Sequence, residues 1–158
     1  MSGKRTLLRK SIRLPAAAYR EPGSSWLITI VTVDRRPFFD DPCLAGAILA
    51  MLTDDASYRG IDLQLACLMP DHAHLLVSVT TGDLVSAVGA LKSRTTKTFR
   101  GFGQAGPLWQ RSFHDQGLRN ERAFEEAVRY ILNNPVLAGL AETWEEYDLI
   151  GGSWVGRP

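Results

Sequence analysis

The sequence predicts an α+β fold of the ferredoxin-like type: a β-α-β-β-α-β antiparallel sheet with one additional C-terminal helix that carries a tyrosine. Strand-forming runs and helical periodicities follow one another in that order. The 158 residues match the size of one domain, with 45% hydrophobic and 22% charged residues. We therefore expect a single domain over residues 1–158, with a basic N-terminal arm at 1–20 and a C-terminal tail at 141–158.

The first strand and the first helix follow one another directly. Residues 24–33 are rich in β-branched side chains, which favour a strand. Asp41 and Pro42 then supply an N-cap and a proline at the first helical position. Gly60 is placed to end the helix that they begin. An apolar stripe at helical spacing supports this helix and consists of Leu44, Ala47, Ile48, Met51 and Leu52.

Two further strands are predicted to form a hairpin. Residues 61–69 and 72–80 are strand-forming and are separated by a Pro-Asp turn. Side chains in a strand alternate between the two faces of the sheet, so His72 and His74 share one face. The alternate positions of the same strand are all apolar and predict the core. The two imidazoles are therefore expected side by side on the opposite face.

The remaining elements complete the order. Asp83 is expected to cap a second helix, and a glycine-rich loop at 101–107 separates this helix from a fourth strand at 108–119. Asn120 is expected to cap the last helix, which Pro135 ends or kinks. The apolar stripe of that helix consists of Phe124, Ala127, Val128 and Ile131.

Composition limits the class of protein. The longest apolar stretch, 43–52, is too short to span a bilayer. The first residues lack the sustained apolar run of a secretory signal, so we expect a cytoplasmic protein with no membrane partner. Cys43 and Cys67 match no CxxC spacing and indicate neither a zinc knuckle nor a disulfide framework.

Charge is unevenly distributed although the net charge is only +1. Residues 1–20 and 84–114 contain Lys and Arg but no acid, and eight of the 17 acids lie in 115–148. This segregation favours a basic track for phosphate groups. A solvated basic tail and helix face is the alternative that charge alone leaves open. The candidate nucleic-acid contacts are Lys92, Arg94, Lys97, Trp109, Arg111 and His114. Core packing is the alternative for Trp109, and pairing with an acid of the last helix is the alternative for Arg111.

The histidine pair is a candidate metal site. Two imidazoles leave the shell of a divalent ion incomplete, so another ligand should come from elsewhere in the chain. On the last predicted helix, Tyr130 and Asn134 are four residues apart and share one face. Asn134 can offer an amide oxygen, and the Tyr130 phenol is a nucleophile once a base, metal or cationic surroundings activate it. The residues alone leave open exposed strand histidines, a packing tyrosine and an N-capping asparagine.

Three segments resemble the REP-associated tyrosine transposases, a branch of the single-tyrosine (HUH-type, IS200-like) transposases. The resemblance extends from about residue 26 to residue 154, nearly the whole chain. The segments that carry it are Met69-Pro-Asp-His-Ala-His-Leu-Leu-Val77, Leu108-Trp-Gln-Arg-Ser-Phe-His-Asp115 and Arg129-Tyr-Ile-Leu-Asn-Asn-Pro-Val-Leu-Ala-Gly-Leu140.

The resemblance implies a metal-dependent nuclease and strand transferase that acts on single-stranded DNA, with REP-type hairpins as substrate. It implies that Tyr130 forms a 5′-phosphotyrosine link and releases a 3′-hydroxyl. It also implies that His72, His74 and Asn134 bind Mg²⁺ or Mn²⁺. We expect a monomer, with a homodimer as the alternative. Two other functions stay open: a domesticated, non-catalytic protein that binds DNA hairpins, and a small metal hydrolase that uses the histidine pair and a water.

Overall fold

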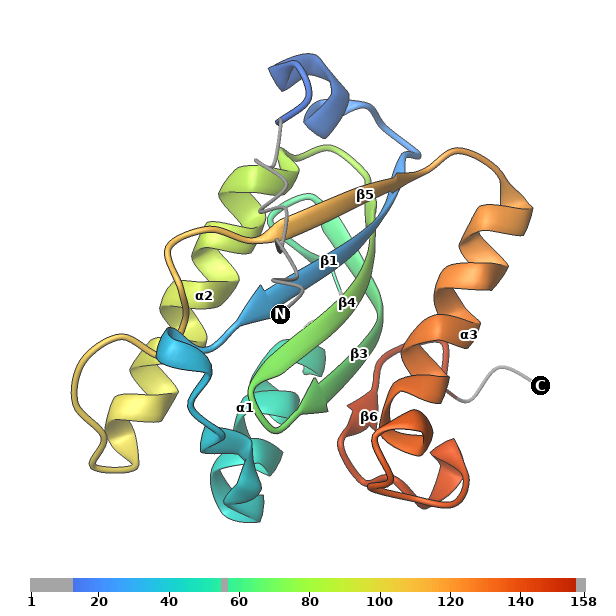
Figure 1. The fold of residues 1–158 in the computed structure, drawn as a ribbon. Coiled ribbons are helices and arrows are strands. Elements are labelled where there is room, and N and C mark those ends of the chain that lie inside the picture. The colour runs from blue at the N-terminus through green and yellow to red at the C-terminus, as the bar shows by residue number, and fades with distance from the viewer. Residues whose placement is uncertain (1–12, 55–56, 156–158) are drawn as a thin grey trace, which may run out of the picture.

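The computed structural model describes residues 13–54 and 57–155 and contains an antiparallel sheet with helices on both faces (Figure 1). Its strands are β1 (Ser25–Val31), β2 (Ser57–Tyr58), β3 (Ile61–Met69), β4 (His72–Val79), β5 (His114–Leu118) and β6 (Ile150–Gly151). Its α-helices are α1 (Pro42–Thr53), α2 (Leu84–Gly101) and α3 (Glu121–Leu137). Short 3-10 helices are η1 (Ala16–Arg20), η2 (Val33–Arg35), η3 (Phe38–Asp40) and η4 (Trp144–Glu146).

The strands lie in the order β2-β3-β4-β1-β5, and β6 pairs with β3. All of these pairs are antiparallel. Four consecutive strands of this sheet, β3-β4-β1-β5, have the arrangement of a β-α-β-β-α-β unit. The predicted α+β, ferredoxin-like class with an added C-terminal helix is thus confirmed.

The helices begin where the sequence predicts. The side chains of Asp41, Asp83 and Asn120 each accept a hydrogen bond from a backbone N–H in the first turn of α1, α2 and α3. Each bond satisfies a donor that has no partner within the helix. These caps fix the starting points of the three helices, and with them the position of every side chain farther along.

Each face of the sheet has its own core. α1 and α2 cover one face, where the alternate β4 positions Ala73, Leu75, Val77 and Val79 are buried. α3 covers the other face (Figure 1), where a smaller core contains Leu65, Cys67, Met69, Leu76, Ala127, Val128, Ile131 and Leu132. The predicted division of β4 is therefore correct, and the face with the two histidines is the one that α3 covers.

A β-bulge makes β3 change faces, which the sequence pattern does not show. The register with β4 shifts between Leu63 and Leu65, so these two residues enter different cores although they are two positions apart. The carbonyl of Gln64, at the bulge, accepts a hydrogen bond of 2.8 Å from the backbone N–H of Trp154. The bulge is thus also a docking point for the C-terminal segment.

Two predicted boundaries are wrong. The fourth strand is shorter than 108–119: β5 begins at His114, and Trp109 forms only an isolated bridge with Thr32. The Lys92 ammonium donates hydrogen bonds to the backbone carbonyls of Gln110 and Ser112. These carbonyls therefore bond to a side chain, as in a loop, and not to a neighbouring strand. Gly60 does not end α1, which stops at residue 53, but lies in the turn before β3 with a φ of +77°.

Pro135 neither ends nor visibly divides the last helix, because α3 continues through it to residue 137. Pro135 lies in the final turn, where its missing N–H costs a single backbone bond, and its ring is buried. Asn134 is consequently inside α3 and does not cap a further turn. Its side chain therefore stays on the same helix as Tyr130.

The two ends of the described chain pack onto the sheet. Residues 1–12 of the predicted arm and 156–158 of the predicted tail lie outside the described residues. Within 13–20, Tyr19 is buried, and its hydroxyl donates a hydrogen bond of 2.7 Å to Asp115. In the tail, the Tyr147 hydroxyl donates to the carbonyl of Leu68. Across the described ranges, no helix is both long enough and apolar enough to cross a membrane.

Candidate functional site

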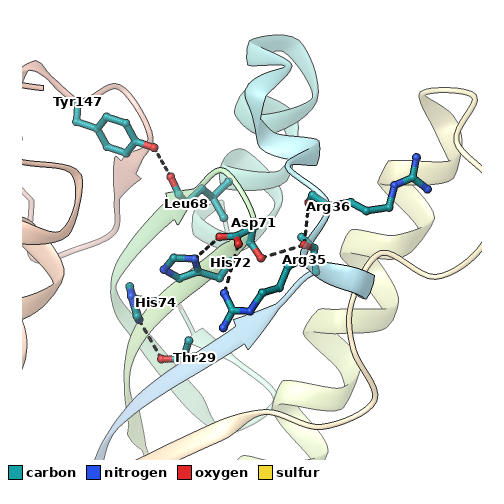
Figure 2. A network of polar contacts seen from close by, with 9 residues as sticks. Thr29, Arg35, Arg36, Leu68, Asp71, His72, His74 and Tyr147 are labelled. Atoms are coloured by element: carbon teal, nitrogen blue, oxygen red, sulfur yellow. Dashed lines mark hydrogen bonds and ion pairs between the residues drawn. The ribbon is translucent and has the colours of Figure 1, made fainter. Parts of the chain in front are cut away.

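His72 and His74 lie beside each other on β4, with ring centroids 4.8 Å apart. Both project from the sheet face that α3 covers, while Ala73 between them enters the opposite core. Figure 2 shows that each ring is bound to a different polar neighbour, His72 to Asp71 and His74 to Thr29. The strand therefore delivers the pair, and its neighbours fix the orientation of the rings.

His72 is oriented by the residue before it. Its Nδ1 lies 2.6 Å from Oδ1 of Asp71, and the other carboxylate oxygen accepts a hydrogen bond of 3.3 Å from Arg35. Partial burial raises the pKa of Asp71, but the contacts with His72 and Arg35 outweigh this effect and hold the pKa below its ordinary value. Asp71 is thus an ionised acceptor, and Nε2 of His72 is left free of this bond.

His74 is buried, and one of its two ring nitrogens has no hydrogen-bond partner among the described residues. Its Nδ1 lies 2.9 Å from the hydroxyl of Thr29, and only 3% of the residue is exposed. Among the described residues, its Nε2 has no hydrogen-bond partner. Burial, together with the neighbouring His72, lowers the pKa of His74 to about 4. A polar contact with the Asn134 side chain raises this pKa by a smaller amount. The ring is therefore neutral near pH 7 and has a nitrogen available for a ligand.

α3 brings the predicted nucleophile to this pair. The rings of Tyr130 and His74 have centroids 5.1 Å apart, and Tyr130 is 49% exposed. One turn later, the side-chain nitrogen of Asn134 donates a hydrogen bond of 2.8 Å to the carbonyl of Tyr130. This bond does not use the amide oxygen of Asn134, and the Asn134 side chain lies close enough to His74 to affect the pKa of that ring. The four predicted residues therefore come from two elements and meet on one face of the sheet.

The donor set fits a divalent ion in one specific way. No group of three or more His, Cys, Asp and Glu side chains in the described ranges could hold a metal. A metal here would need the Asn134 carboxamide as third protein donor beside the two imidazoles. The unpartnered, buried Nε2 of His74 supports the fit, because a buried polar atom normally has a partner. The bonds of Thr29 and Asp71 to the far ring nitrogens are the usual support of metal-binding histidines.

Two adjoining hollows open around Tyr130. The smaller one, about 220 Å³, is lined by both site histidines and by Thr29, Val31, Arg35, His114 and Tyr130, and is called the catalytic pocket below. The larger one, about 510 Å³, lies between α3 and the β1–β5 side of the sheet. The two share Thr29, His114 and Tyr130. A polymer strand could therefore pass from one hollow to the other across the phenol.

The predicted DNA contacts fall into different places. Lys97 and Arg111 are exposed and line a groove of about 530 Å³ with Lys92 and Arg100, called the basic groove below. Lys92 is half-buried and already occupied by two backbone carbonyls of the following loop. The Arg94 guanidinium stacks 4.5 Å above the ring of Tyr58.

Trp109 and His114, the two ring-bearing candidates, are placed very differently. Trp109 is 5% exposed, and its indole N–H donates a hydrogen bond of 2.8 Å to Thr95, so this geometry favours core packing over base stacking. His114 is exposed at the start of β5, beside the catalytic pocket. His114 therefore belongs with Tyr130 rather than with the basic groove.

Three polar residues of the site were not singled out from the sequence: Thr29, Arg35 and Asp71. Asp71 carried a signal, because it directly precedes His72 and a carboxylate next to a histidine is a common support. Thr29 and Arg35 carried none, since they reach the site only through the register of β1 with β4 and through the turn after β1.

Fold and site together define a class: an antiparallel α+β sheet with a histidine pair on a central strand and a tyrosine-bearing helix across it. The family described as "Transposase IS200 like" matches residues 25–134, well over half of the chain. The chain belongs to the IS200-like transposase family.

Two solved structures are similar to this fold, and one further protein is similar in sequence. A solved structure of a REP-associated tyrosine transposase bound to a REP hairpin has a TM-score of 0.63 and 22% identity, and the match covers 84% of this chain and 78% of that chain. A solved structure from Deinococcus radiodurans, described as a candidate transposase, has a TM-score of 0.50 and 25% identity, covering 69% and 88%. An uncharacterized protein of Haemophilus influenzae is 24% identical, with 89% of this chain and 92% of that protein covered.

Proposed function

We propose that the protein is a metal-dependent DNA strand transferase in which Tyr130 cuts single-stranded DNA and remains joined to its 5′ end. The approach of the Tyr130 ring to within 5.1 Å of the His74 ring carries this proposal. The phenol is half exposed and borders both hollows, so a DNA strand can reach it from solvent.

The chemistry is an exchange of one phosphodiester for another. The Tyr130 oxygen attacks the phosphorus of the scissile linkage, the bond from phosphorus to the 3′-oxygen breaks, and the released strand leaves as a 3′-hydroxyl. The phenol loses its proton to solvent and the leaving oxygen gains one. Because the tyrosyl phosphodiester keeps the energy of the original linkage, a 3′-hydroxyl can attack it in the reverse reaction and restore a DNA strand.

His72, His74 and Asn134 are the residues that would hold a divalent ion. Two nitrogen donors and one amide oxygen suit an ion such as Mn²⁺ better than Mg²⁺, which prefers oxygen ligands. When bound, such an ion supplies charge neutralisation and orientation for the phosphate. Asp71 and Thr29 hold the two rings in place by their bonds to the Nδ1 atoms.

A DNA hairpin is the substrate that we propose, since one structural neighbour is bound to a REP hairpin. α2 and α3 lie on opposite faces of the sheet (Figure 1). The basic groove is lined by residues of α2 and the loop after it, and the catalytic pocket by Tyr130 of α3 with residues of the sheet. β5 is the edge strand between them. We therefore place the phosphates of a hairpin stem along Lys97 and Arg111, with the attached single strand passing β5 to reach Tyr130.

We also propose that the chain acts as one domain and as a monomer. The nucleophile and both histidines approach one another within a single chain, so the site needs no residue from a second copy. Light scattering of the protein with and without hairpin DNA measures this directly. An active species of twice the chain mass would overturn the monomer.

The decisive experiment incubates the full chain with a hairpin carrying a single-stranded 5′ extension and Mn²⁺. A protein–DNA adduct that survives denaturation and disappears in Tyr130→Phe supports the proposal. Tyr58→Phe is the matched control, because that ring packs under Arg94 away from the site and its loss should leave the adduct unchanged. Cleavage that persists in Tyr130→Phe would instead indicate a metal hydrolase. Tight binding without an adduct, with Mn²⁺ bound, would indicate a non-catalytic hairpin-binding protein.

A further inference from the structure

One side chain that lines the catalytic pocket, that of Arg35, is positively charged at all physiological pH values and has no role in the reaction as proposed above. Arg35 lines this pocket together with both histidines and Tyr130. Of the lining residues that the structure describes, it is the sole lysine or arginine. Its side chain is 65% exposed and makes one long hydrogen bond, 3.3 Å, to Asp71. A guanidinium has five N–H donors, so most of them remain available for a ligand.

Arg35 is held in an unfavourable backbone conformation. Asp34 and Arg35 both have a φ of +52°, in the left-handed region that non-glycine residues rarely adopt. Two consecutive residues in this region are costly, and such strain is found preferentially at functional sites. Glycine would be the natural residue at position 35 if only the turn mattered.

The surrounding contacts maintain this turn. Thr32 is fully buried, and its hydroxyl lies 2.8 Å from the carbonyl oxygen of Arg36 and 2.9 Å from that of Asp71. The backbone N–H of Thr32 also donates to the carbonyl of Asp71. The turn that carries Arg35 is therefore fixed to the turn that precedes His72, another residue that lines the same pocket.

The effect of the turn is to separate two adjacent arginines. Figure 2 shows Arg35 directed toward Asp71 and His72, while Arg36 extends away from them. The Arg36 guanidinium instead lies 4.9 Å above the ring of Phe38. The two residues have the same charge and neighbouring positions but different surroundings, which makes Arg36 a matched control.

We propose that Arg35 is a catalytic residue that binds a non-bridging oxygen of the phosphate under attack; this inference rests on the proposed function. The ion pair with Asp71 is exposed and long, so it contributes little by itself and can share the guanidinium with a phosphate. Arginine matches phosphate geometry with parallel N–H donors. Negative charge that develops on the phosphate oxygens during attack would then be stabilised by a donor already in place.

The test measures the single-turnover rate of adduct formation at saturating hairpin DNA and Mn²⁺. We expect Arg35→Gly and Arg35→Lys to slow the reaction about 10²- to 10³-fold and about tenfold, respectively. Arg35→Gly should unfold at an unchanged or higher temperature, because glycine relieves the positive φ. Arg36→Ala, with the same loss of charge, should keep the wild-type rate.

A second substrate separates contact with the phosphate from support of Asp71. On a hairpin with a neutral methylphosphonate at the cleaved linkage, the difference between wild type and Arg35→Gly should shrink to within about threefold, because the charge that Arg35 binds is gone. A full loss on both substrates would overturn the phosphate contact. A wild-type rate in Arg35→Gly would overturn the Arg35 proposal and leave the proposed function standing. A wild-type protein without any adduct would overturn both.

Discussion

The hydroxyl oxygen of Thr29 lies 2.9 Å from Nδ1 of His74, across the antiparallel pair of β1 and β4. Thr29 is also the register partner of His114 on β5. One threonine thus stands between two histidines in a row across three strands. Because its contact occupies Nδ1, the nitrogen of His74 that remains for a ligand is Nε2.

The first prediction removes this hydroxyl. Thr29→Val keeps the shape of the side chain, and we expect it to weaken Mn²⁺ binding about 10- to 100-fold, the usual effect of losing the residue that orients a metal-binding histidine. Thr29→Ser keeps the hydroxyl and should bind Mn²⁺ nearly as the wild type does. Calorimetric titration of Mn²⁺ into each protein measures the difference. Equal affinities in Thr29→Val and the wild type would remove the orienting role.

The second prediction concerns the histidines themselves. His72→Ala and His74→Ala should each abolish adduct formation and leave hairpin affinity largely intact, since phosphate contacts elsewhere dominate binding. Gel-shift titration and adduct assays are run on the same preparations. His74 is 3% exposed, so its variant also needs a thermal melt to establish folding. Parallel losses of binding and cleavage would mean that the histidines maintain the fold.

The third prediction tests the basic groove by salt dependence. Lys97→Ala and Arg111→Ala should each weaken hairpin binding and reduce the slope of log affinity against log salt by about one. Arg129→Ala is the control, because Arg129 is exposed on α3 and pairs with Glu125. Fluorescence anisotropy at several salt concentrations gives the slopes. A slope that Lys97→Ala leaves unchanged would place the phosphates elsewhere.

The fourth prediction compares two left-handed glycines. A Cβ at Gly60 would lie 2.3 Å from the backbone nitrogen of Gly82, whereas a Cβ at Gly103 would meet no described atom within 4 Å. Gly103→Ala should cost about 1–2 kcal/mol of unfolding free energy, from conformation alone. Gly60→Ala should cost clearly more, because backbone must also move. Urea unfolding provides both values, and equal costs would show that the turn before β3 accommodates a side chain.

The fifth prediction uses the two cysteines. Burial raises the pKa of the Cys67 thiol to about 12, and this residue is fully inaccessible, whereas Cys43 is exposed. At pH 8 the native protein should therefore react with a thiol reagent at one position and the denatured protein at two. Mass spectrometry of labelled peptides identifies the position. Rapid labelling of Cys67 in the native protein would show that the core beneath α3 opens.

Local rules predicted most of the fold. The cap residues Asp41, Asp83 and Asn120 were recognisable because their short polar side chains precede apolar helical stripes. The alternation of β4 predicted the face of His72 and His74, since the opposite positions are all apolar. These features depend on residues close together in the sequence, so a single chain is enough to recognise them.

Long-range pairing decided what could not be predicted. The bulge after Leu63 leaves no signature in composition, because the residues on both sides of it are equally apolar. Lys92 was expected to meet phosphate, but the following loop folds back and offers it carbonyls. For Trp109 the sequence left base stacking and core packing open, and the position of the same loop favours core packing. In each case the partner lies on a segment whose position only the folded chain defines.

The exposed loop at 101–107 divides the chain into two parts of unequal length, and each part carries only some of the side chains of the candidate site. The part before it contains the imidazole pair with its threonine and carboxylate supports, and the part after it contains the phenol and the carboxamide. Neither fragment alone possesses a complete centre. If the proposed function holds, a protease that nicks this loop, or a gene cut at the same point, would create two inactive polypeptides, and the return of the proposed DNA joining would report their reassociation.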